Sequence, residues 1–209
     1  MIKGQNFNRP EKGSQIKVQP ITDLKAIAGI KALLADRPRD LALFMVGINT
    51  ALRASDLLRI TVGQVRHLKA GDDLELVEQK TGKARRITLN SACVEAIQGL
   101  LNHYAQSVTG PVEDVEYLFQ GQRTGNDGPR PLTVPYLNAL VKSWCKALRL
   151  KGNYGSHTLR KTFGYHQRKT FCIDVVTLMT VFNHASPKQT LAYLCIQPDE
   201  VKHVYMNAL

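Results

Sequence analysis

The segment that most constrains the fold is residues 39–50, which as a helix would carry apolar side chains around nearly its whole circumference. It contains an unbroken apolar run from Leu41 to Val46, with Ile48 two residues further on. Pro38 stands just ahead of it, where proline suits the first turn of a helix. A helix that is apolar all round must be covered all round by other elements. We therefore predict a central core helix enclosed by further helices.

The spacing of apolar residues changes along the chain. Helical spacing predicts further helices from Thr22 or Asp23 to about Asp36, from Ser55 (as the cap) to Leu58, and at 91–106, 135–148, 156–168, 173–182, 187–194 and 199–207. Short runs bounded by turns predict strands at 60–65, 74–77 and 85–89, and a Gly/Pro-rich loop is expected at about 109–131. The predicted fold class is α+β: mainly helical, with one small three-stranded antiparallel sheet.

Length and composition narrow the class of protein. The 209 residues favour one domain, with residues 1–21 as an extended arm and 22–209 as the folded part. Hydrophobic residues make up 44%, enough for a core, and no apolar run approaches the ~20 residues of a membrane helix. The N-terminus lacks the apolar stretch of a signal peptide. Four widely spaced cysteines, expected to be buried, predict neither a disulfide framework nor a zinc site and favour a cytoplasmic location.

Basic charge is concentrated in one stretch of the chain. The formal net charge is +11, and residues 128–173 hold nine Lys and Arg but no Asp or Glu. The remainder has 19 basic against 17 acidic residues, so it is nearly neutral. Clustered Lys and Arg displace counterions from phosphates, and the asymmetry therefore indicates a polyanionic partner, most simply nucleic acid.

Six polar residues stand out from apolar surroundings: Arg53, Lys80, His157, Arg160, His184 and Tyr193. Each taken alone has an ordinary explanation. Arg53 can pair with Asp56 three residues on, and the two residues of a His-x-x-Arg pair share a helix face in many proteins. A single His or Tyr near the end of a chain is more often a core or surface residue than a catalytic one. The ordered set is far more specific than any of its members.

Four sequence blocks carry this set: Ala51–Leu58, Gln79–Lys83, His157–Gly164, and Phe182–Ser186 leading to Tyr193. Together they resemble the tyrosine recombinase, or phage integrase, family over about residues 20–209. The resemblance implies the DNA breaking-rejoining fold, with residues 22–209 as the catalytic domain, and is closest to the short, catalytic-domain-only integrases.

Two features depart from the family pattern. Asn183 stands where the family usually has glycine, and asparagine can serve there because it tolerates positive φ better than most residues. Only some 20 residues precede the first predicted helix, where the family usually carries a separate core-binding domain. We therefore expect that an accessory DNA-binding protein could be needed for tight recognition of a site.

The resemblance implies a site-specific recombinase that cuts DNA through a 3′-phosphotyrosine and rejoins it without ATP, metal or cofactor. Tyr193 would be the nucleophile and His157 would accept its proton. Arg53, Arg160 and His184 would bind the phosphate, whose negative charge grows in the transition state.

Lys80 would give a proton to the leaving 5′-oxygen, and Lys83 in the same turn is the alternative. The expected DNA contacts are Lys83, Lys142, Lys146, Arg149, Lys151 and Lys161. The expected assembly is a homotetramer on double-stranded DNA formed from monomers in solution, associated with the nucleoid. In this family the C-terminal segment often docks on a neighbouring subunit, and Tyr205 would belong to its apolar stripe.

Three other functions are compatible with parts of the sequence. A DNA-relaxing enzyme resembling type IB topoisomerases would use the same chemistry without a specific site. A catalytically silent DNA-binding regulator would need the basic surface but not the late tyrosine. A basic helical domain with no role on nucleic acid is least compatible with the segregated charge.

Overall fold

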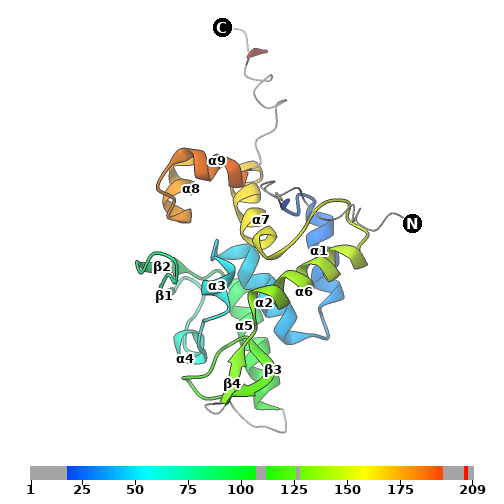
Figure 1. Ribbon diagram of the computed structural model, residues 1–209, viewed down its shortest axis with the longest axis vertical. Helices are drawn as coiled ribbons and strands as arrows, with labels where there is room; N and C mark the ends of the chain where they lie inside the picture. Colours follow the sequence, from blue (N-terminus) through cyan, green and yellow to red (C-terminus); the bar gives the residue numbers. More distant parts are fainter. Residues whose placement is uncertain (1–17, 107–111, 126–127, 195–204, 207–209) are drawn as a thin grey trace, which may run out of the picture.

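The computed structural model describes residues 18–106, 112–125, 128–194 and 205–206. Its helices are α1 (Leu24–Leu33), α2 (Pro38–Asn49), α3 (Ala54–Leu57), α4 (Val62–Val65), α5 (Ser91–Ala105), α6 (Val134–Ala147), α7 (Ser156–Lys169), α8 (Val175–Phe182) and α9 (Pro187–Leu194). Its strands are β1 (Asp73–Val77), β2 (Ala84–Thr88), β3 (Gln120–Gly125) and β4 (Gly128–Pro131). Figure 1 shows helices predominating, and the α+β class is confirmed.

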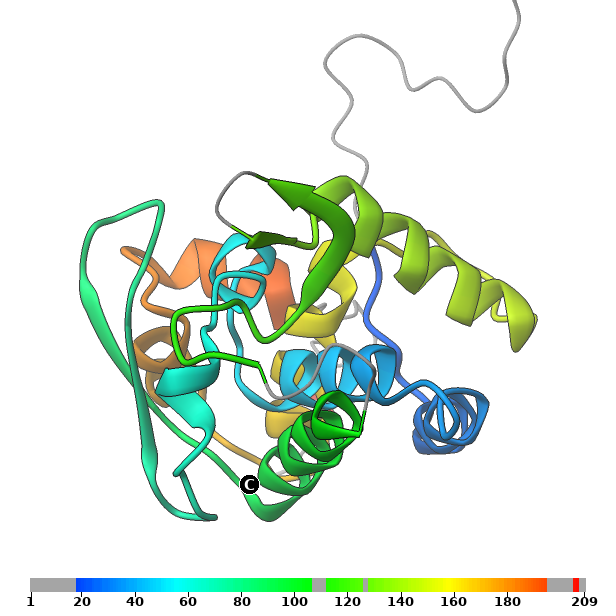
Figure 2. The same ribbon diagram turned by 90° about the horizontal axis from the view of Figure 1, so that it is seen from below.

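Helix α2 is the central core helix that its sequence predicts. Ala42, Leu43, Phe44 and Val46 are fully buried, and Pro38 occupies the first turn. Figures 1 and 2 show α2 enclosed, with α5 and α7 packed on different sides of it. The Phe44 ring meets the buried Trp144 ring of α6 edge to face, at 5.8 Å between centroids. The helix that is apolar all round therefore organises the main core.

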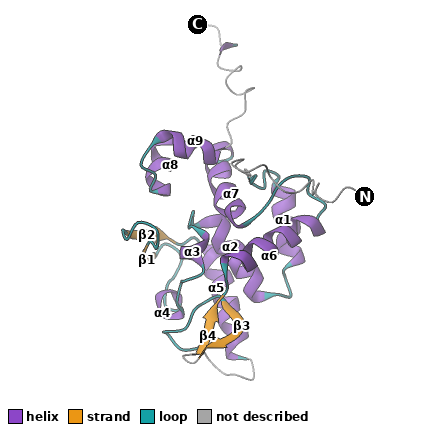
Figure 3. Ribbon diagram, in the orientation of Figure 1, coloured by secondary structure: helices purple, strands orange, loops and turns teal. Residues whose placement is uncertain are grey.

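The strands form two separate hairpins, as Figure 3 shows, and the predicted three-stranded sheet is wrong. Strands β1 and β2 pair antiparallel with Leu74 opposite Ile87, and confirm the predicted hairpin at that position. The predicted strand at 60–65 is replaced over Val62–Val65 by the short helix α4, and only Thr61 keeps an antiparallel β-bridge, with Tyr117. The start of α4 has a capping signature that the strand interpretation overlooked, since Gln64 Oε1 accepts the Thr61 backbone N–H at 2.9 Å.

The other differences from prediction are local. Strands β3 and β4 lie inside the predicted loop 109–131. Helix α3 has Arg53 rather than Ser55 at its N-cap. Asp23, one of the two predicted caps, is the N-cap of α1. Cys93 and Cys145 are buried as expected, whereas Cys172 is exposed. The predicted helix at 199–207 lies outside the described residues except for residues 205–206.

A smaller second core joins α8 and α9 to the rest of the molecule. Ala51, Leu178, Phe182 and Leu194 are buried together, and Tyr193 packs at the edge of this cluster. Residues 1–17 of the predicted arm lie outside the described residues. The end of the arm runs beside α7, where the Ile21 N–H donates to Thr162 Oγ1 at 2.9 Å. The second core is what places the C-terminal helices against α7.

Candidate active site

Different elements supply the six residues that the sequence singled out. Arg53 follows the end of α2, where Ala51 takes a left-handed backbone conformation (φ 53°) that turns the chain sharply towards α3. Lys80 lies in the turn between β1 and β2. The remaining four lie at the start of α7, just after α8 and in α9: His157, Arg160, His184 and Tyr193. Close contacts, or the effect of one residue's charge on the pKa of another, connect all six.

Arg160 is the buried centre of the site, with 2% of its surface exposed. Its Nη1 donates to the Ala51 carbonyl, and its Nη2 donates to the Phe182 carbonyl at 2.7 Å. Its Nη2 also lies 3.4 Å from His184 Nε2. A guanidinium has five N–H groups, so these described contacts leave others, including Nε, for an incoming anion. Burial lowers the pKa of Arg160 to about 10, which keeps it cationic at neutral pH.

His184 is held as a neutral ring beside Arg160. Burial, followed by the charges of Arg160, Arg53 and Arg85, lowers its pKa to about 4. A guanidinium can only donate, so His184 Nε2 accepts from Arg160 and Nδ1 donates to Thr190 Oγ1 at 3.0 Å. Asn183 ends α8 in the left-handed conformation (φ 52°, ψ 47°), which confirms that asparagine replaces glycine at this turn.

Tyr193 lies against two histidines and an arginine. Its hydroxyl is 3.4 Å from His157 Nδ1, and its ring centroid is 5.1 Å from that of His184 and 5.6 Å from Arg160 Cζ. Desolvation of the ring, followed by the charges of Arg160, Lys161 and Lys80, lowers the pKa of His157. His157 is therefore neutral at pH 7 and can accept the phenol proton.

Lys80 and Lys83 are both exposed at the tip of the β1–β2 hairpin. After burial and the charges of Arg160 and Lys161, the charge of Lys80 also lowers the pKa of His157. The assignment of Lys80, rather than Lys83, as the proton donor stays a prediction.

Glu78 is the functional residue that sequence reasoning missed. Its carboxylate is fully buried and pairs with Arg53 (Nη1 to Oε2, 2.7 Å) and Arg85 (Nη1 to Oε1, 3.1 Å). Asp56, expected to orient Arg53, lies further away at 3.9 Å. The alternation of β1 contains the signal, since Glu78 falls on the inward face with Leu74 and two residues after Leu76.

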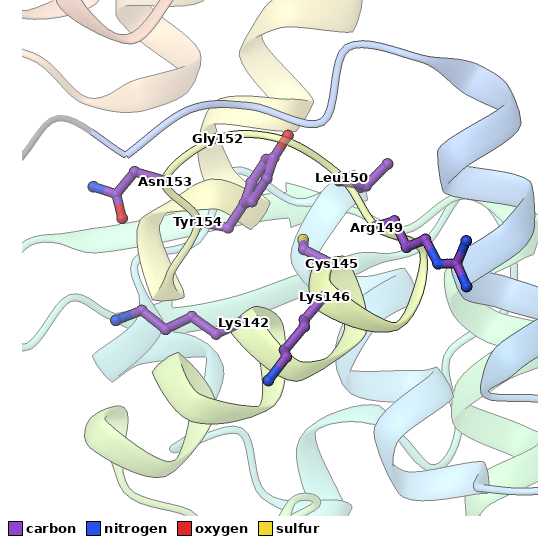
Figure 4. A pocket seen from close by; sticks show the side chains of 8 residues that line it. All are labelled: Lys142, Cys145, Lys146, Arg149, Leu150, Gly152, Asn153 and Tyr154. Atoms are coloured by element: carbon purple, nitrogen blue, oxygen red, sulfur yellow. The ribbon is translucent and has the colours of Figure 1, made fainter.

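The predicted DNA contacts do not lie together: Lys83 is at the exposed hairpin tip, Lys151 is exposed in the loop between α6 and α7, and the other four lie in two further places. Lys161 is 9% exposed and its Nζ lies 5.6 Å from the Tyr193 ring centroid, so it belongs to the site rather than to an outer surface. Lys142, Lys146 and Arg149 line a hollow of about 550 Å³. Figure 4 shows their side chains pointing away from one another. Diverging cations suit an extended polyanion better than a single small anion.

A pH prediction follows from the lowered pKa of His184. Unfolding would return this pKa from about 4 to 6.5, so protonation favours the unfolded chain between these values. The stabilisation is complete above pH 6.5 and is lost as the pH falls towards 4. The ring is half-buried, so we expect a loss on the order of 1–2 kcal/mol.

Urea unfolding followed by the fluorescence of Trp144, the one tryptophan in the sequence, measures this effect at several pH values. The difference in unfolding free energy between wild type and His184→Gln should shrink as the pH falls from 6.5 to 4. The exposed His67→Gln is the control and should show a constant difference. A constant difference for His184→Gln as well would contradict the neutral buried ring.

The described residues contain no group of three or more His, Cys, Asp or Glu side chains placed to hold a metal ion. None of the helices in the described ranges has the length and hydropathy to span a membrane.

Comparisons with known proteins agree with this geometry. The sequence model of the phage integrase family matches residues 23–200. The chain is 35% identical over 191 residues to the probable integrase/recombinase YoeC of Bacillus subtilis (strain 168), covering 90% of this chain and 95% of that protein. It is 27% identical over 167 residues to tyrosine recombinase XerC of Caldanaerobacter subterraneus subsp. tengcongensis, covering 79% of this chain but 44% of that protein.

Solved structures show the same fold at low identity. XerH site-specific recombinase, bound to palindromic difH substrate in a post-cleavage complex, aligns with a TM-score of 0.72 and 18% identity, over 93% of this chain and 53% of that one. XerA recombinase aligns with a TM-score of 0.70 and 17% identity, over 90% of this chain and 65% of that one. The present chain therefore spans about half to two thirds of these two structures.

The fold and the arrangement around Tyr193 define the catalytic domain of a tyrosine recombinase. The match over residues 23–200 shows that the chain belongs to the phage integrase family. It is accordingly an enzyme of site-specific recombination, which cleaves and rejoins DNA strands.

Proposed function

We propose that the six residues carry out DNA cleavage and religation through a 3′-phosphotyrosine at Tyr193. The observation that carries the proposal is the convergence on one tyrosine of a neutral base, a buried arginine and a neutral histidine. The Tyr193 hydroxyl is 3.4 Å from His157 Nδ1, and Arg160 and His184 lie against its ring. An ordinary surface tyrosine has no requirement for a neutral histidine and a buried arginine beside it, so these neighbours favour a catalytic role for Tyr193.

The proposed cleavage step balances its protons within the site. Tyr193 transfers its phenol proton to His157 Nδ1 while its oxygen forms a bond to phosphorus. The bond from phosphorus to the 5′-oxygen breaks, and that oxygen takes a proton from the Lys80 ammonium. Religation reverses both transfers, and the phosphotyrosine keeps one phosphoester bond for each one broken, so no nucleotide hydrolysis is required.

Arg53 and Arg160 would stabilise the phosphate as its negative charge increases. Both are cationic, and each buried or half-buried donor aimed at developing charge is typically worth about 3–4 kcal/mol. His184 now accepts from Arg160 through Nε2. A bound phosphate would displace that contact and favour the proton on Nε2, so His184 would become a donor to the phosphate oxygen. Phosphate binding would therefore change which ring nitrogen of His184 carries the proton.

The experiment that tests this function uses nicked suicide duplexes, on which cleavage becomes irreversible. Wild-type protein should form a denaturant-resistant adduct that retains a label at the 3′-phosphate side and releases a free 5′-hydroxyl. Release of a free 3′-hydroxyl with the protein on the 5′-phosphate would contradict the proposed polarity.

Relaxation of supercoiled DNA, as by a type IB topoisomerase, is the second candidate function, because it would use the same catalytic residues. It predicts removal of supercoils from plasmids regardless of their sequence. A recombinase instead should act only on plasmids carrying its site, and joint products should appear when two sites are supplied.

DNA is the partner that this function requires, and the finer details of assembly are part of the proposal. We expect four protomers on two duplexes, formed from monomers in solution, with an accessory DNA-binding protein as a possible further component. A cytoplasmic, nucleoid-associated location goes with this function. Light scattering of the protein with and without a two-site DNA substrate measures the assembly directly.

The basic side chains around the hollow in Figure 4 should contribute electrostatically to binding. A Lys142→Gln/Lys146→Gln double variant should lower the slope of log affinity against log salt by about 2, since each neutralised phosphate contributes ~0.9. The matched control is Lys25→Gln/Lys31→Gln on the exposed face of α1, which should leave the slope unchanged. Fluorescence anisotropy with a labelled duplex measures both. Equal effects from the two pairs would contradict a local contact.

A further inference from the structure

Glu78 occupies an unusual position for a carboxylate. It directly follows β1, is fully buried, and receives hydrogen bonds to Oε2 from Thr81 Oγ1 at 2.8 Å and Asn183 Nδ2 at 3.0 Å, besides its pairs with Arg53 and Arg85. Burial by itself would raise its pKa, but the hydrogen bonds from these partners and the charge of Arg53 lower the pKa to about 2. Glu78 is therefore an anion wherever the protein is folded and active.

The hydrogen-bond partners of Glu78 come from two segments that are far apart in the sequence. Thr81 belongs to the hairpin turn, three residues after Glu78, while Asn183 lies 105 residues further along the chain at the end of α8. A second contact reinforces the link, because Arg85 Nη2 donates to the Val181 carbonyl at 2.8 Å. Figure 1 shows the β1–β2 hairpin and α8 as separate elements on the same side of the molecule. These bonds fasten one to the other.

Lys80 sits between the two hairpin residues that these bonds hold. It is two residues after Glu78 and one before Thr81, so the Glu78 carboxylate fixes the turn on both sides of Lys80. Asn183 directly precedes His184. The contact from Glu78 to Asn183 therefore sets the turn that carries Lys80 relative to the segment that carries His184 and Tyr193.

The backbone conformation at residue 183 does not by itself require an asparagine side chain. The left-handed turn at the end of α8 could be made equally well by glycine. Glycine, however, has no amide to donate to a carboxylate. The choice of asparagine thus adds one charge-assisted hydrogen bond to the turn.

We propose that Glu78 and Asn183 form a clasp that positions Lys80 for proton donation by fastening the β1–β2 hairpin to the end of α8. Both are positioning residues, since they act through Lys80 rather than on the DNA. The inference rests on the proposed function, in which Lys80 protonates the leaving 5′-oxygen.

The test is the Asn183→Gly variant, which keeps the turn and removes only the amide. On an ordinary suicide duplex its cleavage rate should fall about tenfold, as expected for the loss of one hydrogen bond to a charged group. On a duplex with sulfur in place of the bridging 5′-oxygen, the rate should stay within twofold of wild type. A thiolate leaves without a proton, because thiols are far more acidic than alcohols.

A double variant and a control complete the design. If Asn183 acts through Lys80, adding Asn183→Gly to Lys80→Ala should cause no further loss on the ordinary duplex. Thr180→Ala, on the exposed side of the same helix, should cleave both duplexes as wild type does. Thermal unfolding of each variant checks that the fold is intact.

The possible failures are distinguishable. Equal slowing on the oxygen and sulfur duplexes would overturn the clasp, as would an unchanged rate on the oxygen duplex or additive losses in the double variant. Absence of any adduct from the wild type on both duplexes would instead overturn the proposed function on which the clasp depends.

Discussion

Replacing Tyr193 by phenylalanine should abolish the covalent protein–DNA adduct while leaving DNA binding and folding intact. The substitution removes one oxygen, and the ring keeps its contacts with Phe182 and His184, whose centroids lie at 5.6 and 5.1 Å. No other group can then form the phosphotyrosine, so adduct formation should fall by at least about 10³-fold. Denaturing gels of labelled suicide duplex measure the adduct, and anisotropy measures binding.

Tyr205→Phe is the matched control for this prediction. Tyr205 is the other tyrosine late in the chain, and 85% of its surface is exposed. Its variant should form the adduct at the wild-type rate. An adduct that persists in Tyr193→Phe and disappears in Tyr205→Phe would show that the nucleophile has been wrongly assigned.

Replacing Arg160 by lysine should lower the cleavage rate by about 10² to 10³-fold. Lysine retains the charge but replaces a planar set of five donors by a single ammonium group. One ammonium cannot serve the Ala51 and Phe182 carbonyls and a phosphate oxygen at once. The expected size corresponds to the loss of one preorganised donor to the transition state.

The loss should appear in single-turnover cleavage on suicide duplexes, with the variant saturating the DNA so that binding does not limit the rate. Unfolding experiments should show a destabilisation of about 1–3 kcal/mol from the unsatisfied buried carbonyls. Arg168→Lys, the same substitution further along α7, is the control and should retain the wild-type cleavage rate. Cleavage by Arg160→Lys within threefold of wild type would rule out Arg160 as a phosphate ligand.

Much of the fold could be predicted because it depends on local patterns. The apolar run in α2 required burial on all sides, and the helices from Ser91 onward begin or end within about two residues of their predicted limits. The prediction failed at residues 62–65, which form a helix whose start carries a capping contact from Gln64. It also failed at β3 and β4, since pairing across a turn rich in Gly and Pro is weakly encoded in side-chain spacing.

The site could be predicted only in part. The motif residues were recognisable as a set, and the structure brings His157, Arg160, His184 and Tyr193 together. Arg53 pairs with Asp56 as predicted, but its second and nearer partner, Glu78, was not predicted. Asp56 is close in sequence, but Glu78 is the nearer carboxylate, at 2.7 Å against 3.9 Å.

The sequence by itself determined which segments are helical, which helix is central, and which six residues have the chemistry to cleave a phosphodiester. Those properties follow from side-chain polarity at spacings of a few residues. Only the tertiary structure decided that His184 is neutral, that Lys161 lies beside Tyr193, and that Glu78 meets Asn183. These three properties depend on burial and on contacts between residues up to 105 positions apart in the sequence. The distances between such residues are fixed only when the helices and the hairpin pack together.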